Sequence, residues 1–141
     1  MTKELTTDEL AHELRLALGR LVRRLRAEPG PPTAQMTVLG RLDREGPASV
    51  SDLAAAERMR PQSMAQTVRD LESGGLVSRT PDPYDGRRAI VALTPAGTEL
   101  LHATRARREG RFAEVLDSEL DAREREVLRE AIGLLGRIAD A

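Results

Sequence analysis

Apolar side chains recur at helical spacing near the start of the chain. Between residues 8 and 27, leucines and a valine follow one another in steps of three and four, and arginines fill most of the other positions. Residues 28–32, Glu-Pro-Gly-Pro-Pro, then break the pattern, because proline lacks an amide hydrogen and restricts the residue before it. The pattern predicts an amphipathic helix over 8–27.

A second helix is predicted directly after the break. Thr33 is expected to be its N-cap, an apolar stripe runs from position 36 to 42, and Gly46-Pro47 ends it. Residues 48–50 are too short for more than a β-bridge. Ser51 is then expected to cap a short helix that ends near Glu57.

A further helix is predicted over 61–73, about three residues after the short one. Pro61 fits its first position, where the missing amide hydrogen costs nothing, and Gly74-Gly75 ends it. This spacing is typical of a helix-turn-helix, in which the second helix enters the major groove of DNA. The alternative is an ordinary helical hairpin with a polar face toward solvent.

The rest of the chain predicts a β-hairpin and two more helices. Strands are expected over 76–80 and 89–93, joined by a loop that contains Asp85-Gly86. Thr94 and Pro95 then begin a helix that runs to about residue 116. The last helix begins at a capping box, in which Asp121 is followed three residues later by Glu124.

The elements divide into three regions. Residues 33–93 form a compact module, and residues 1–32 and 94–141 flank it. The flanking helices carry more apolar stripe than this small module can cover, so a second copy of the chain is expected to bury the remainder. We therefore predict a mainly α fold with a small β-hairpin wing, in which the N- and C-terminal helices form a dimerisation region.

Composition narrows the class of protein. The 141 residues are 40% hydrophobic but include only two aromatic residues, Tyr84 and Phe112, so the core must be built from Leu, Val, Ala and Met. With no cysteine, disulfides, cysteine-ligated metals and thiol redox sensing are excluded. No apolar run of about 18 residues and no apolar signal region occur, so we expect a cytoplasmic protein without a membrane partner.

The charge is nearly balanced. The net charge is −1, and residues 31–93 contain eight basic and eight acidic side chains. DNA binding would therefore depend on a few well-placed arginines rather than on bulk charge. All basic residues except Lys3 are arginine, whose planar fork suits phosphates and base edges; a GC-rich genome is the alternative reason for this bias.

Helix 61–73 carries the side chains expected to read DNA. Amide side chains pair with adenine edges, arginine pairs with guanine, and hydroxyls bind phosphates. We expect Gln62, Gln66 and Arg69 to face the bases. We expect Arg60, Ser63 and Thr67 to face the phosphates.

The hairpin that follows a helix-turn-helix forms a wing, and its tip can reach the adjacent minor groove. We expect Arg87 to enter or line this groove, and Arg88 either to support Arg87 or to bind phosphate. Asp82 and Asp85 are expected to hold the loop and to orient an arginine through a charge-assisted bond, and Gly86 to shape the turn. The alternative is a solvated turn with incidental charges.

Other chemistry has little support in the sequence. Glu9 and Glu13 flank His12 at helical spacing, which would suit a small zinc site, but a solvent-facing histidine is the simpler interpretation. No cysteine nucleophile or glycine-rich phosphate loop is present, and no serine lies near a histidine in sequence. We therefore predict no enzyme activity, metal or cofactor.

Three motifs carry a family resemblance: "LESGGLVSR" at 71–79, "DPYDGRR" at 82–88 and "LTPAG" at 93–97. With the order of elements, they resemble the multiple-antibiotic-resistance regulator (MarR) family. The family's wing pattern is Asp-any-Arg-Asp-any-Arg; Asp82, Asp85 and Arg87 match it, and Tyr84 replaces the first arginine. The resemblance implies a bacterial winged-helix homodimer that binds palindromic operators on double-stranded DNA. It also implies a repressor that a small-molecule effector releases.

A winged-helix module that binds another protein rather than DNA is the alternative function. The nearly neutral charge of residues 31–93 is the feature that favours it.

Overall fold

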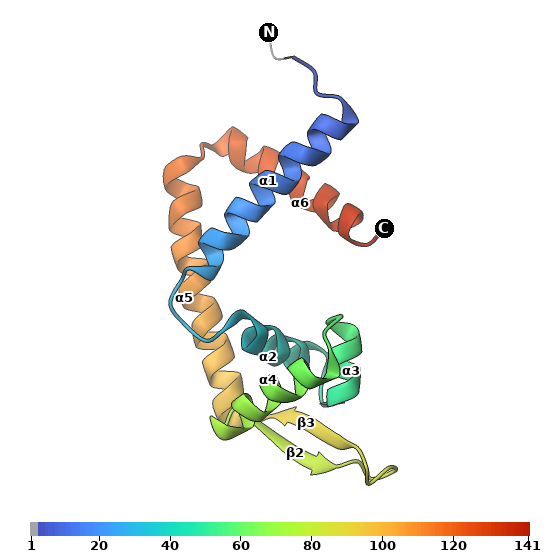
Figure 1. Cartoon of the computed structure of the whole chain (residues 1–141). Helices are drawn as coiled ribbons and strands as arrows, with labels where there is room; N and C mark the ends of the chain where they lie inside the picture. The colour runs from blue at the N-terminus through green and yellow to red at the C-terminus, as the bar shows by residue number, and fades with distance from the viewer. Residues whose placement is uncertain (1–2) are drawn as a thin grey trace. The chain divides into compact units, whose positions relative to one another are not determined.

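The computed structural model describes residues 3–141, which divide into two compact units at residues 101 and 102. The elements are α1 (Thr7–Arg26), α2 (Thr33–Glu45), β1 (Ala48–Ser49), α3 (Val50–Ala56), α4 (Pro61–Ser73), β2 (Val77–Pro81), β3 (Ala89–Leu93), α5 (Pro95–Glu119) and α6 (Ala122–Ala139). Helices dominate, and three strands form one small antiparallel sheet (Figure 1). The predicted mainly α fold with a small β-hairpin is therefore confirmed.

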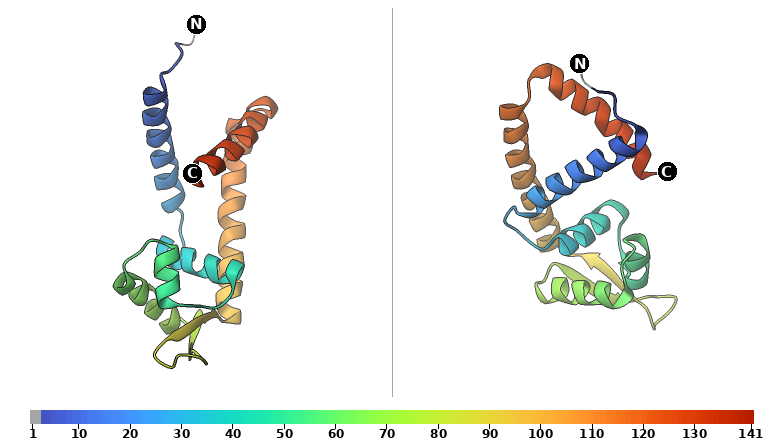
Figure 2. Two further views of the ribbon diagram at one scale, coloured as in Figure 1. Left: turned by 90° about the vertical axis from the view of Figure 1, so that its right-hand side faces the viewer. Right: turned by 45° about the horizontal axis from the view of Figure 1, so that its top comes forward.

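The sheet has the strand order β1-β3-β2. The hairpin pairs Val77 with Leu93 at its base and Pro81 with Ala89 near its tip. On the other edge of β3, Ala48 lies opposite Val91, so the stretch predicted as a bridge is a two-residue strand. Figure 2 shows the hairpin projecting from the helices of the first unit.

The boundaries of α4 and β3 agree with the prediction, but two predicted helix caps are wrong. Thr33 is already helical, and Pro32 occupies the N-cap position without a side-chain cap. The cap of α3 is Ser49 rather than Ser51, and its Oγ accepts a hydrogen bond from the Asp52 amide at 3.1 Å. Ser49 ends β1 in an extended conformation, so the helix begins directly after it.

Capping boxes begin the first and the last helix. The predicted box at Asp121 and Glu124 is confirmed, with reciprocal bonds of 2.8 and 3.1 Å. A second capping box, which was not predicted, is formed by Thr6 and Glu9 and begins α1. The Thr6 amide donates to Glu9 Oε2 at 2.8 Å, and this hydrogen bond lowers the pKa of Glu9 below its ordinary value.

The core of the first unit forms where the inward faces of α2, α3, α4 and the sheet meet. Among the residues that the structure describes, eleven apolar side chains form this core. Ten come from these elements, namely Val38, Leu39, Leu42, Leu53, Ala54, Met64, Val68, Leu71, Val77 and Val91, and α5 adds Leu101. On α4 the buried residues are Met64, Val68 and Leu71, which confirms the predicted inward stripe. Because this stripe is fixed in the core, the opposite face of α4 is held toward solvent.

Candidate DNA-binding surface

The outward face of α4 is polar. Gln62, Ser63, Gln66 and Arg69 are exposed, and Thr67 is half-buried. Arg60 is exposed and occupies the N-cap position. Six of the eight residues predicted to contact DNA thus lie on or directly before one helix, and the inward side chains of that helix fix its orientation.

Hydrogen bonds join several of these side chains. Arg69 Nη2 donates to Gln66 Oε1 at 2.9 Å, and Gln66 Nε2 donates to Asp70 Oδ1 at 2.9 Å. This chain orients the Gln66 amide on the exposed surface. Thr67 differs from the expectation, because its hydroxyl donates to the Ser63 carbonyl at 3.1 Å and would have to leave it to donate to a phosphate.

The turn before α4 is fixed by an ion-pair network that the sequence did not suggest. Arg41 of α2 pairs with Glu57, the C-cap of α3, at 2.5 Å, and with Glu45 at 2.9 Å. These two carboxylates raise the pKa of Arg41, and the hydrogen bond that Arg41 donates to Glu57 is the stronger cause. The next residue, Arg58, has a left-handed backbone with φ 52°. Arg41 thus holds the chain where it turns from α3 toward α4.

The wing loop is held by its two aspartates. Asp82 Oδ1 accepts the Tyr84 amide at 2.8 Å, and Asp85 Oδ1 accepts the Arg87 amide at 3.1 Å. Within residues 3–141, neither carboxylate pairs with an arginine, which differs from the expectation that they orient one. Backbone amides lie two residues away from each aspartate, so local turns use these carboxylates first.

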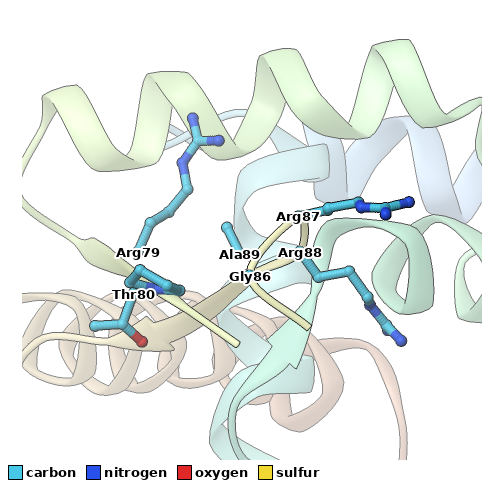
Figure 3. Close-up of a pocket in the computed structure, with 7 residues that line it drawn as sticks. Arg79, Thr80, Gly86, Arg87, Arg88 and Ala89 are labelled. Carbon is cyan, nitrogen blue, oxygen red and sulfur yellow. The ribbon is translucent and has the colours of Figure 1, made fainter. Parts of the chain in front are cut away.

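The three arginines of the hairpin line an open hollow of about 230 Å³ (Figure 3). Arg79 pairs with Glu72 of α4 at 3.3 Å, and Arg88 pairs with Asp52 of α3 at 3.1 Å. Arg87 is exposed, and its guanidinium makes no hydrogen bond or ion pair to any residue that the structure describes. Figure 3 shows the side chains of Arg87 and Arg88 leaving the loop in different directions.

No group of three or more potential metal-ligating side chains occurs among residues 3–141. Glu9, a candidate zinc ligand beside His12, accepts a hydrogen bond from the Thr6 amide in the cap of α1. Glu9 Oε1 also lies 3.6 Å from Lys3 Nζ, so the two side chains form an ion pair.

A helix-turn-helix with an exposed polar second helix, followed by a β-hairpin with an outward arginine, defines the winged-helix class of DNA-binding proteins. Residues 30–88 match the model of the MarR family. A helix-turn-helix transcriptional regulator of Mycobacterium bovis is 39% identical over 134 residues, which are 93% of each chain. The chain belongs to the MarR family of transcriptional regulators, which are DNA-binding proteins and not enzymes.

Further relatives agree with this assignment. The transcriptional repressor NicR of Pseudomonas putida is 32% identical over 69% of this chain and 63% of its own length. A crystal structure of a putative transcriptional regulator from Pseudomonas aeruginosa is 38% identical, covers 94% of both chains and has a TM-score of 0.79. A MarR family protein from Bacillus stearothermophilus, 23% identical, covers all of both chains at a TM-score of 0.79 and supports the fold alone.

Proposed function

We propose that this protein is a sequence-specific, cytoplasmic repressor that binds a palindromic operator as a homodimer and is released by a small-molecule effector. The observation that carries the DNA-binding part is the combination of an exposed polar helix, α4, with Arg87 on the wing, whose guanidinium has no partner among residues 3–141. Repression is supported by the relative from P. putida, which is named a repressor.

The side chains divide between two grooves in this proposal. Gln62, Gln66 and Arg69 read base edges in the major groove, because amide and guanidinium groups form paired hydrogen bonds there. Arg60 and Ser63 contact phosphates and fix the register. Arg87 reaches the minor groove, where the negative potential attracts arginine.

Binding to DNA from the region upstream of its own gene tests the proposal. Fluorescence anisotropy with a labelled duplex gives the affinity across a salt titration, and a scrambled duplex measures non-specific binding. We expect Gln62→Ala to lower the affinity for the upstream duplex more than for the scrambled one. We expect Arg87→Ala to weaken binding to both duplexes. The slope of log affinity against log salt concentration, the salt slope, should become shallower by about 0.9, because one positive charge no longer displaces a counterion from the DNA.

Two outcomes would contradict this function. Equal affinity of the wild-type protein for both duplexes would remove sequence specificity. Absence of binding to either duplex at low salt would favour the alternative, a winged-helix module that binds another protein.

A further inference from the structure

Arg88 connects the wing to α3 across a long sequence distance. Its Nη2 donates to Ser49 Oγ at 2.7 Å and to Asp52 Oδ2 at 3.1 Å, although these residues lie 39 and 36 positions away. Ser49 is 2% exposed, so one end of this connection is anchored in the interior. Arg88 is therefore fixed to the helix-turn-helix, whereas the neighbouring Arg87 guanidinium is unpaired among the described residues.

The Ser49 hydroxyl is fully used in this arrangement. It accepts from Arg88 Nη2 and from the Asp52 amide at 3.1 Å, and its oxygen lies 3.1 Å from Ser51 Oγ. A hydroxyl has two acceptor positions and one donor, so the Ser49 hydrogen points to Ser51. The atom that caps α3 is thus the same atom that holds the wing arginine.

The backbone of Arg88 closes the wing loop. Its carbonyl accepts the Asp82 amide at 2.9 Å, and its amide donates to the Asp85 carbonyl at 3.0 Å. A side chain that fixes this residue therefore fixes the base of the loop, one position from Arg87. Ordering a loop before binding lowers the entropy cost of the contact it makes.

Asp52 argues against Arg88 as a phosphate contact. Its carboxylate neutralises the Arg88 guanidinium at 3.1 Å and would repel a phosphate that approaches the same group. The ion pair is partly exposed, with 43% of the Arg88 side chain and 68% of the Asp52 side chain accessible. An exposed pair adds little to the stability of the fold, so its main effect is to hold the Arg88 side chain in place.

We propose that Arg88, held by Asp52 and Ser49, is a positioning residue that presents Arg87 to DNA and is not itself a DNA contact. The proposal rests on the proposed function, because Arg87 must bind DNA for its position to matter. Of the two roles expected for Arg88, supporting Arg87 or binding phosphate, the proposal assigns it the first.

Asp52→Asn gives a test in which the two explanations predict opposite signs. Loss of a negative charge beside the DNA would by itself strengthen binding and, if Arg88 became free for phosphate, steepen the salt slope. The positioning role instead predicts binding up to about five-fold weaker, which is the upper size expected when one partly exposed ion pair is lost. Anisotropy with the upstream duplex measures the affinity, and circular dichroism confirms that the variant is folded.

A double-mutant cycle with Arg87→Ala and Arg88→Ala supplies a second measurement, which also serves if Asp52→Asn does not fold. If Arg88 acts through Arg87, the double variant binds like Arg87→Ala and its salt slope falls by about 0.9 in total. If both arginines touch DNA, the losses add and the slope falls by about 1.8.

Each outcome decides between the roles. Tighter binding by Asp52→Asn, or additive losses in the cycle, overturns the positioning role and leaves the proposed function intact. Failure of the wild-type protein to bind the upstream duplex overturns both.

Discussion

Tyr84 is the most exposed of the large hydrophobic side chains that the structure describes. It is 98% exposed, while its backbone amide is held by Asp82 at 2.8 Å. The loop thus fixes the position of a residue whose side chain does not pack in the first unit. Since the family's wing pattern has arginine here, Tyr84 removes one positive charge from the tip.

Tyr84→Arg is expected to tighten DNA binding and to steepen the salt slope by about 0.9, because a second charged contact becomes available on a loop that is already ordered. A salt titration by anisotropy measures both quantities. Tyr84→Gln is the matched control, because it supplies a long polar side chain without charge and should leave the slope unchanged. An unchanged slope for Tyr84→Arg would mean that the tip does not approach the DNA backbone.

At the scale of residues, the sequence predicted which polar residues face outward from α4, but it did not predict the hydrogen-bond and ion-pair partners of the arginines. The polar face of α4 follows from helical periodicity, because Met64, Val68 and Leu71 determine which side is buried. The partners of Arg88 and Arg41 could not be predicted, because Asp52 is 36 positions from Arg88 and Glu57 is 16 positions from Arg41. Contacts at such separations depend on how the elements pack, and local patterns do not contain that information.

The junction between the wing and α5 explains the motif at 93–97. The Thr94 hydroxyl donates to the Gly75 carbonyl at 2.6 Å, and the same oxygen accepts the Gly97 amide at 3.1 Å. The backbone of Leu76 lies so close to α5 that a Cβ on Gly97 would be 2.0 Å from its carbonyl oxygen. This position needs glycine because of close backbone approach, even though it lies within a helix.

Gly97→Ala is expected to lower the free energy of unfolding by about 1–3 kcal/mol, because the added methyl group overpacks against backbone that cannot move away. Urea denaturation at fixed protein concentration measures this change. Gly110→Ala is the matched control in the same helix, where a Cβ would meet nothing within 4 Å. Alanine should raise stability there by up to about 1 kcal/mol; a gain at both positions would show that the contact at Leu76 is relieved at little cost.

At the scale of elements, the periodic segments were predictable and their ends were less so. The helix over 61–73 and the strand over 89–93 have the predicted bounds, because apolar spacing and glycine or proline signals agree there. The cap at Ser51 was misplaced because Ser49, two residues earlier, suits a cap equally well. Thr33 is not a cap because α2 already begins there, directly after Pro32. The starts of α2 and α3 are set by Pro32 and by β1, outside the local pattern.

Two helices leave apolar side chains exposed in the single chain. On α1 these include Leu10, Leu18, Leu21, Val22 and Leu25, and on α6 they are Val127, Ile132, Leu134 and Ile138. None of the helices between residues 3 and 141 is long and apolar enough to cross a membrane. In the proposed homodimer, these apolar side chains would be buried against a second copy of the chain.

Leu134→Asp tests whether α6 forms part of the dimer interface. Val127, Leu134 and Ile138 lie on one stripe of α6 at helical spacing, and Leu134 is 54% exposed in the single chain. A charge on this stripe would be buried without a partner in a dimer, so we expect a shift to monomer in sedimentation and a large loss of operator affinity. Gly133→Asp is the matched control, since it places the same charge on the polar face that carries Arg129 and Arg137, where a Cβ meets nothing within 4 Å. If both variants sediment as the wild-type protein does, α6 is not part of a dimer interface, and the apolar face of α1 becomes the next to test.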